Sequence, residues 1–192
     1  NSSLFKKVKS VYETRETLNL DPEQSMLLEK QYKGFSRNGA NLNEEDKEKL
    51  RKIDTELSKL SLQFGENVLA DGNAFELHIT HEKDLKGLPD GAKEAASLLA
   101  KNRNKEGWLI TLDYPSYIPF VTYAENRELR KKLSIAFGKK GFQNNENNNE
   151  KIVLNIVNSR HQRANLLGYE THAHFVLEER MAETPEKVLS FS

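Results

Sequence analysis

The sequence predicts a mainly α-helical, multi-helix domain that includes a short two-stranded antiparallel ribbon. One observation is a long apolar stripe at helical spacing, formed by Leu50, Ile53, Leu57, Leu60, Phe64 and Val68. A second observation is a pair of strand-like segments, around 74–80 and 107–113, which can pair with each other. Because a two-stranded ribbon is stable only when other elements cover it, we expect helices to pack on it.

Two helices are predicted in the first forty or so residues. Apolar residues recur at helical spacing over residues 4–12, which indicates an amphipathic helix. The tetrapeptide Asp21–Gln24 combines a capping aspartate, a proline at the first helical position and a glutamine placed for a capping box. A second helix therefore begins there and ends near Gly34 or Gly39.

The apolar stripe belongs to a third, longer helix. Asn43 caps its acidic first turn, Glu44–Asp46, which suits the positive end of the helix macrodipole. We expect the helix to run for roughly seven turns and to end at Asp71-Gly72. Helical periodicity changes to strand periodicity directly afterwards, so a boundary within the chain is expected near 71–74.

The remaining segments predict shorter elements. Helices are expected at residues 92–100, at 121–137 with a break near Asn126, at 152–168 and at 171–181, with a loop at 138–149. Thr184-Pro185 begins one more helix, and the chain ends inside it at Ser192. We therefore expect residues 1–192 to be a single helical fragment of a longer protein.

The composition argues against several classes of protein. The 29 basic residues equal the 29 acidic residues, so the chain lacks the basic excess of a nucleic-acid-binding domain. No apolar run is long enough to span a membrane. The absence of cysteine excludes disulfides, cysteine-bound zinc and a thiol nucleophile. The apolar fraction of 36% fits an elongated helical domain or a piece whose core is completed elsewhere.

The histidines lack the spacing of a zinc-protease site. The motif H-E-x-x-H needs two histidines four residues apart on one helix, with the glutamate between them as base. The histidines present are His78 and His81 beside Glu82, His161, and the pair His172 and His174. We expect His78 to face solvent, and the last two to divide between core and surface.

Other catalytic signatures are missing as well. Neither the nucleophile elbow G-x-S-x-G nor a glycine-rich phosphate loop occurs. The carboxylate pairs Glu44-Glu45 and Glu178-Glu179 are expected on solvated helix faces rather than in catalysis.

Two clusters of side chains are compatible with a binding function. A basic cluster on one predicted helix consists of Arg127, Arg130, Lys131 and Lys132. It can meet phosphates, but an exposed face balanced by Glu125 and Glu128 is the favoured interpretation. An aromatic group consists of Trp108, Tyr114, Tyr117, Phe120 and Tyr123. These side chains can line a peptide groove, although packing of a strand-to-helix junction is favoured.

Short segments in a fixed order carry a resemblance to a known family. The segments are Leu4–Tyr12, Leu27–Glu29, Tyr32–Leu42, Ile53–Leu60, Phe64–Leu69, Leu85–Pro89, Gly107-Trp108, Pro115–Pro119, Asn126–Arg130, Leu166–Tyr169 and Met181–Pro185. In this order they resemble the zinc metallopeptidases of the thimet oligopeptidase, oligopeptidase A and dipeptidyl carboxypeptidase (peptidyl-dipeptidase) family. The Asn-rich loop and the segment Gln24–Glu29 are most similar to the bacterial dipeptidyl carboxypeptidase branch.

The resemblance implies a mostly helical fold whose two halves enclose a deep channel for short, unfolded peptides. It also implies zinc in the full-length parent, bound by H-E-x-x-H and a downstream glutamate, where a water attacks the zinc-polarised carbonyl. None of those ligands occurs in this chain, so catalytic, cofactor-binding and metal-binding residues are all assigned as none, and no cofactor is expected here. Many relatives carry an aromatic residue and an arginine where this chain has Ile135–Gly141. If that arginine contributes to the channel in the relatives, this chain has no equivalent residue.

The sequence therefore predicts a channel-wall segment of a zinc-dependent oligopeptidase that is inactive by itself. The expected partners are short peptides, in the parent, and the catalytic half of the same chain, with neither nucleic acid nor a membrane. The cytoplasm is favoured over the periplasm. The alternative is a stand-alone helical module that binds a protein or a peptide.

Overall fold

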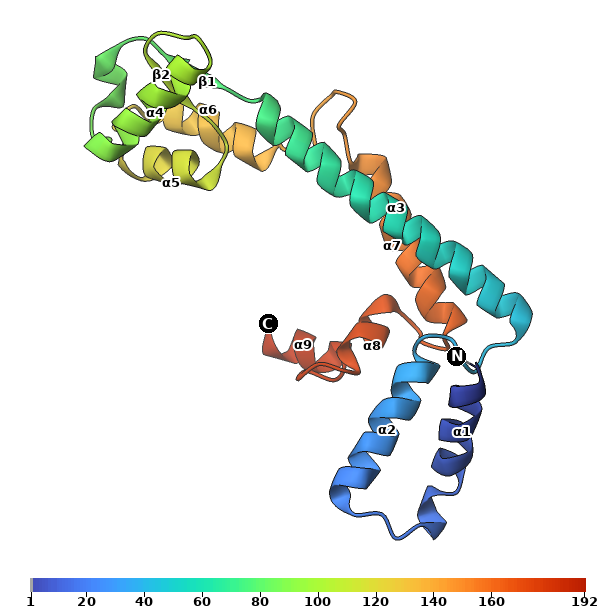
Figure 1. Cartoon of the computed structure of the whole chain (residues 1–192). Coiled ribbons are helices and arrows are strands. Elements are labelled where there is room, and N and C mark those ends of the chain that lie inside the picture. The colour runs from blue at the N-terminus through green and yellow to red at the C-terminus, as the bar shows by residue number, and fades with distance from the viewer. Residues whose placement is uncertain (1) are drawn as a thin grey trace. The chain divides into compact units, whose positions relative to one another are not determined.

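The computed structural model describes residues 2–192, most of which are helical (Figure 1). The helices of this part of the chain are α1 (Ser2–Glu13), α2 (Pro22–Ser36), α3 (Glu44–Ala74), α4 (Asp90–Asn102), α5 (Tyr114–Tyr123), α6 (Arg127–Gly138), α7 (Glu150–Leu166), α8 (His172–Leu177) and α9 (Pro185–Phe191). Two 3-10 helices, η1 (Arg15–Thr17) and η2 (Glu82–Leu85), and two strands, β1 (Leu77–Ile79) and β2 (Trp108–Ile110), complete it. The predicted fold class, mainly α with a short antiparallel ribbon, is confirmed. None of the helices in residues 2–192 combines the length and apolarity needed to cross a membrane.

The described residues form two compact units. Unit 1 contains the residues up to Lys59 together with Asn155–Ser192, and unit 2 contains Leu60–Leu154. Helices α3 and α7 each contribute residues to both units. Most of the buried apolar side chains of the described chain belong to unit 2, so the two units differ in the size of their cores.

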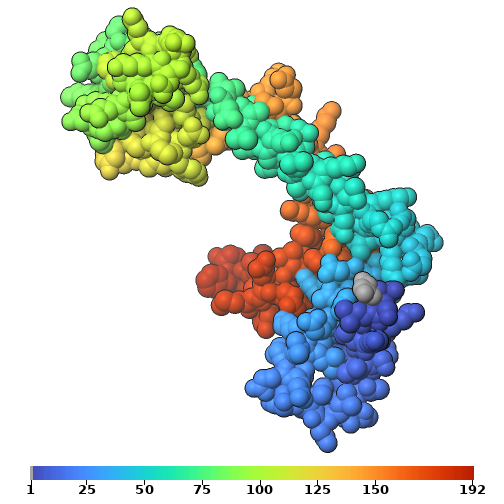
Figure 2. Space-filling model, viewed as in Figure 1, coloured from blue at the N-terminus to red at the C-terminus, as the bar shows by residue number. Residues whose placement is uncertain are grey.

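The core of unit 2 forms around the ribbon. β1 pairs antiparallel with β2, so that Leu77 lies opposite Ile110. Leu77 and Ile79 are buried while His78 between them is exposed, as the predicted alternation requires. Helix α4 packs on β2, and α5 and α6 pack on each other, which gives the single body of green and yellow segments in Figure 2. The largest fully buried side chains are Leu85, Leu109, Phe120 and Leu133.

Glycine is required where β2 begins. Gly107 has a φ of +83°, a conformation that residues with a side chain rarely adopt. A Cβ at this position would also collide with the carbonyl oxygen of Ile79 on the neighbouring strand. Any other residue would therefore both strain the backbone and push the two strands apart.

The predicted helix 121–137 is in fact two helices, and the first starts earlier than predicted. The break is confirmed, since Asn126 caps α6 by accepting a hydrogen bond from the backbone nitrogen of Leu129 at 3.2 Å. The expected start is wrong, because α5 contains Pro115 near its N-terminus and Pro119 in its interior. A proline in the first turn removes no intrahelical hydrogen bond, so Pro115 begins the helix rather than delaying it.

Asp71 organises the predicted loop between α6 and α7. Its carboxylate is 3% exposed and accepts hydrogen bonds from the backbone nitrogen of Gly141 (2.8 Å) and from the side-chain amides of Gln143 (3.2 Å), Asn145 (2.9 Å) and Asn147 (2.9 Å). Burial by itself raises the pKa of Asp71, but these hydrogen bonds outweigh it, and the pKa lies below the ordinary value for aspartate. The Asn-rich tract is thus ordered around a buried anion.

Unit 1 begins with a hairpin of α1 and α2. The rings of Tyr12 and Tyr32 stack with their centroids 3.9 Å apart. The predicted capping box is present, because Oδ1 of Asp21 accepts a hydrogen bond from the backbone nitrogen of Gln24 (2.7 Å) and the Gln24 side chain accepts one from the Asp21 nitrogen (3.2 Å). The sequence signal for the start of α2 therefore corresponds to two formed hydrogen bonds.

Two helix ends differ from the prediction. Helix α3 continues to Ala74, past the expected end at Asp71-Gly72, because Asp71 binds the following loop and does not terminate the helix. The helix predicted over 171–181 is the much shorter α8, followed by turns. Glu183 then adopts a left-handed φ of 62°, which redirects the backbone before α9 starts.

Candidate functional site

The histidines do not assemble into a metal site. His78 is exposed on β1, as expected, and its Nε2 lies 2.6 Å from the carbonyl oxygen of Glu106. His81 precedes η2 and His161 lies on α7, and both are exposed. Within residues 2–192, no three side chains of the His, Asp or Glu type converge in an arrangement that could hold a metal ion.

The expected division of His172 and His174 between core and surface is wrong, because both are half-buried. Helix α8 is short and contacts α9, and its Phe175 ring also contacts Arg37 and Arg163, so both histidines have neighbours that cover them in part. Nδ1 of His174 lies 2.8 Å from Oγ1 of Thr171. Nδ1 of His172, in contrast, is buried and has no hydrogen-bond partner among the described residues.

The aromatic group divides between core and surface. Phe120 is fully buried, and Trp108 and Tyr117 pack against the same core, as the junction interpretation predicted. Tyr114 and Tyr123 instead are 67% and 55% exposed. The junction is therefore mainly a packing feature with two outward-facing rings.

The basic cluster is mostly an exposed helix face, as expected. Arg130 is the exception, since it is half-buried and donates to the carbonyl oxygens of Ala124 and Glu125. These carbonyls lie at the break between α5 and α6. Arg130 therefore stabilises the break, and it is not available to a phosphate.

The two carboxylate pairs behave differently. Glu44 and Glu45 lie on the exposed first turn of α3, as predicted. Glu178 and Glu179 follow α8 instead of lying on a helix face; Glu179 is exposed as predicted, whereas Glu178 is half-buried, and both are bound by residues distant in sequence. Glu179 forms an ion pair with Lys30 on α2 at 2.7 Å. Glu178 belongs to a denser arrangement, which we call the Arg37 cluster.

The Arg37 cluster consists of Arg37, Tyr169, Phe175 and Glu178. Arg37 lies at the C-terminal end of α2, and its side chain is only 16% exposed. Its Nη1 donates to the Glu178 carboxylate and to Oη of Tyr169 (3.3 Å), and its Nη2 donates to the carbonyl oxygen of Phe175 (2.7 Å). Oη of Tyr169 donates to the same carboxylate at 2.6 Å. One arginine thus holds three groups of the segment 169–178.

The Phe175 ring connects this cluster to α7 and α3. The guanidinium carbons of Arg37 and Arg163 lie 4.1 and 5.0 Å from the ring centroid. Nε of Arg163 also donates to Oδ1 of Asp54 on α3 at 2.7 Å. The Tyr169 ring meets Phe175 edge-on at 5.2 Å, and burial followed by the bond to Glu178 raises the pKa of Tyr169. The charges of this region are therefore matched to one another within unit 1.

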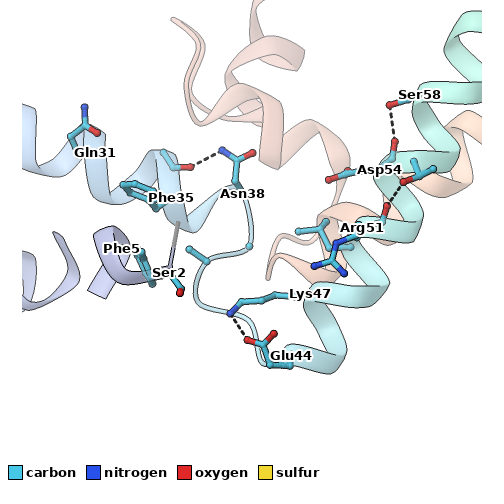
Figure 3. Close-up of a pocket in the computed structure, with 15 residues that line it drawn as sticks. Ser2, Phe5, Gln31, Phe35, Asn38, Glu44, Lys47, Arg51, Asp54 and Ser58 are labelled. Carbon is cyan, nitrogen blue, oxygen red and sulfur yellow. Dashed lines mark hydrogen bonds and ion pairs between the residues drawn. The ribbon is translucent and has the colours of Figure 1, made fainter. Parts of the chain in front are cut away.

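A groove of about 1010 Å³ lies beside the first half of α3 and is lined by residues of α1, α2 and α3 (Figure 3). Phe5 and Phe35 contribute apolar surface, and Lys47, Arg51 and Asp54 contribute charge. Each of these charged groups already has a partner of opposite sign, in Glu44, Glu48 and Arg163 respectively. The groove therefore offers a concave surface whose charged side chains are already paired. It has no unpaired charge among these residues that would select a charged ligand.

The two hydroxyl groups that α3 contributes to the groove are not activated for catalysis. Oγ1 of Thr55 donates to the carbonyl oxygen of Arg51, and Oγ of Ser58 donates to that of Asp54, both at 2.8 Å. A nucleophilic hydroxyl needs a base that accepts its proton, and a backbone carbonyl cannot act as one. These hydroxyls therefore serve the helix backbone.

Sequence patterns did not reveal the Arg37 cluster. Arg37 lies in a segment that carries the family resemblance, but nothing in its neighbourhood points to Glu178, which lies 141 positions away. The aromatic ring between two arginines, Phe175, also has no local signature. Pairs of this kind depend on how distant helices fold together, which helical periodicity does not encode.

Comparisons with known proteins agree with the resemblance. The model of Peptidase family M3 matches residues 120–192. Oligopeptidase A of Escherichia coli (strain K12) is 32% identical over 195 residues, covering 100% of this chain and 29% of that protein. Oligopeptidase A of Salmonella typhimurium is 35% identical over 176 residues, covering 90% of this chain and 26% of that protein. Dipeptidyl carboxypeptidase of Escherichia coli is 32% identical over 192 residues, covering 100% of this chain and 28% of that protein. The chain thus spans between a quarter and a third of the length of these relatives.

Proposed function

The chain belongs to peptidase family M3, and from this membership we propose that it is a non-catalytic segment of a zinc-dependent oligopeptidase. The observation that carries the proposal is the 32% identity to an oligopeptidase A over the entire chain. The sequence also contains no H-E-x-x-H motif anywhere in its 192 residues. In this proposal the zinc ligands and the general base lie in other residues of the parent protein.

The side chains of residues 2–192 do not form a zinc site. Zinc in proteins is held by at least three converging nitrogen, oxygen or sulfur ligands. One ring nitrogen of His78 faces a backbone carbonyl, and one ring nitrogen of His172 is buried where no second ligand reaches it. We therefore assign no step of peptide hydrolysis to these residues.

We propose that this segment contributes to the parent protein by steric exclusion rather than by chemistry. Its helices would form part of the wall of the channel and so limit substrates to short, unfolded peptides. Both long helices keep large apolar side chains at the surface, among them Leu62 (64% exposed) and Leu69 (63%) on α3 and Leu154 (60%) on α7. Exposed apolar side chains of this density are typical of surfaces that another part of a protein covers, and the catalytic half is the proposed cover.

The names of the relatives supply the proposed substrates and compartment. They include an oligopeptidase A and a dipeptidyl carboxypeptidase, so we propose that the parent hydrolyses short peptides, either internally or by releasing C-terminal dipeptides. One plant relative is named a probable cytosolic oligopeptidase A. Because of this name, we propose that the parent protein is located in the cytoplasm rather than in the periplasm.

The proposal is tested by comparing the 192-residue chain with a longer chain translated from the same gene. We expect the purified short chain to contain no stoichiometric zinc by elemental mass spectrometry and to leave a mixture of short peptides intact. The longer chain should carry downstream H-E-x-x-H, bind zinc and cleave the same peptides until a chelator is added. Chelator-sensitive cleavage by the short chain alone would overturn the proposal.

An interaction module is the second candidate, and the exposed face of α5 favours it. Tyr114 and Ile118 are 67% and 45% exposed and lie one helical turn apart, so they share a face that can meet a peptide. A stop codon directly after Ser192 would support this candidate, whereas a reading frame that continues into H-E-x-x-H supports the peptidase segment.

A further inference from the structure

His172 lies beside the Phe175 ring of the Arg37 cluster. It is the first residue of α8, and its ring centroid is 6.2 Å from that of Phe175 with the two planes inclined by 24°. Phe175 is the same ring that the guanidinium groups of Arg37 and Arg163 contact. A change in the charge of His172 therefore acts directly on the contacts that attach the segment 169–179 to α2 and α7.

One nitrogen of His172 is buried without a hydrogen bond. Among the described residues Nδ1 has no partner, so neither a proton nor a lone pair on this atom is compensated. A buried polar atom without a partner destabilises the folded state, and the cost is larger when the group carries a charge. Burial of this atom therefore favours the neutral ring over the protonated ring.

The charged neighbours of His172 are mostly cationic. Arg163 from α7 and Arg37 from α2 lie 5.0 and 4.1 Å from the centroid of the adjacent Phe175 ring, and the positive charge of Arg160, also on α7, acts on His172. The nearby carboxylates already have partners, since Glu178 is bound by Arg37 and Tyr169, and Asp54 is bound by Arg163. Burial, followed by Arg160 and Arg163, lowers the pKa of His172 from its ordinary value.

We propose that His172 makes the segment 169–179 acid-responsive, so that protonation of its ring loosens the attachment of this segment to α2 and α7. A proton on the half-buried ring adds a third cation near two arginines, and the segment relieves the repulsion by exposing the ring to water. Opening would also release Lys30 from Glu179 and Arg37 from Glu178, which are the ion pairs that join the segment to α2. The inference concerns unit 1 alone and does not depend on the proposed peptidase role.

The pH range follows from the direction of the pKa change. Because the folded state favours the neutral ring, the stabilisation is fully present above the ordinary histidine pKa of 6.5 and is lost as the pH falls through that value and below. This is the range in which a histidine changes its charge.

The experiment is hydrogen exchange of the full 192-residue chain between pH 8 and pH 5, corrected for the intrinsic rate at each pH. We expect the protection of peptides covering 169–179 to fall several-fold toward pH 5, while peptides around Leu109 in unit 2 keep theirs. His172→Phe, which keeps a ring but cannot be protonated, should remove the pH dependence. His174→Gln is the matched control and should retain it, because Nε2 of His174 faces the carboxylates of Glu170 and Glu186 at 3.8 and 3.9 Å.

A second measurement remains decisive if His172→Phe fails to fold. Arg160 is exposed on α7, so Arg160→Gln should fold normally. Proton NMR titration should show the His172 midpoint below the ordinary histidine pKa of 6.5, and Arg160→Gln should move it upward while Arg127→Gln leaves it unchanged. Protection of 169–179 that is independent of pH, or a midpoint that Arg160→Gln does not move, overturns the proposal.

Discussion

Arg37 illustrates how one side chain can join elements that are far apart in sequence. A guanidinium carries several donors in a fixed plane, which lets Arg37 bind a carboxylate, a phenol and a backbone carbonyl at the same time. A lysine has the same charge but presents it as a single point. The geometry of the cluster therefore requires arginine, and charge alone is not sufficient.

This requirement gives a prediction for Arg37→Lys. We expect the substitution to destabilise the attachment of the segment 169–178 by about 2 kcal/mol, because hydrogen bonds to charged groups contribute about that much when they are partly buried. Hydrogen exchange of this segment measures the loss. Arg51→Lys is the control, since its ion pair with Glu48 is exposed and should contribute little. Equal effects of the two substitutions would contradict the assignment.

A second prediction at this scale concerns Asp71→Asn. The substitution places an amide where four donors converge, so buried N–H groups lose their acceptor, and we expect a loss of about 2 kcal/mol at pH 7. Since folding lowers the pKa of Asp71, its stabilisation is present above about pH 4 and is lost as the pH falls further.

Urea unfolding followed by the fluorescence of Trp108, the single tryptophan, reports on unit 2 and measures this effect. The difference between Asp71→Asn and the unmodified chain should shrink from pH 7 to pH 3. Asp90→Asn, on the exposed first turn of α4, should show little difference at either pH. A difference of constant size across this range would mean that the ionised carboxylate is not the cause.

At the scale of elements, local signals predicted where helices begin better than where they end. The starts of α2, α3 and α9 coincide with residues that were predicted to begin these helices and that accept capping hydrogen bonds. The ends of α3 and α8 did not follow from sequence, because tertiary contacts decide whether a glycine or an aspartate terminates a helix. Helix α5 begins before the expected residue 121, because Pro115 lies in its first turn and a proline can begin a helix.

The capping box of α2 yields a prediction for Asp21→Ala. Two hydrogen bonds are lost, and we expect the helix and the hairpin it forms with α1 to be destabilised by about 1 kcal/mol. Backbone amide exchange in the first turn of α2 measures the change. Gln31→Ala, at an exposed position in the middle of the same helix, should leave that exchange unaltered. An unchanged first turn in Asp21→Ala would show that the cap is dispensable.

At the scale of the whole chain, the two units differ in how they are stabilised. The contiguous unit 2 holds the fully buried Leu85, Leu109, Phe120 and Leu133, whereas among the described residues of unit 1 the buried apolar side chains are those of Phe5, Leu50 and Ala164. Unit 1 relies instead on aromatic stacking and the ion pairs around Arg37. The boundary expected near 71–74 stays a prediction.

We therefore predict that residues 60–154, produced alone, fold cooperatively. Thermal unfolding followed by circular dichroism and by Trp108 fluorescence should give coincident transitions. Leu133→Ala should reduce the stability of this segment by about 3 kcal/mol, because it leaves a cavity in the core, and Leu98→Ala, at a 59% exposed position, should have a small effect. A non-cooperative, broad transition would show that unit 2 needs residues outside it.

The sequence by itself determined the helical class, the ribbon and its alternation, most helix starts and the resemblance to a metallopeptidase family, because these depend on neighbouring residues or on short segments in order. Only the tertiary structure decided that Glu178 is bound by Arg37, that Asp71 is surrounded by the Asn-rich loop, and that His172 is half-buried beside two arginines. Each of these depends on residues brought together from distant positions, and a buried charge is stable only where such partners converge. Local periodicity carries no information about that convergence.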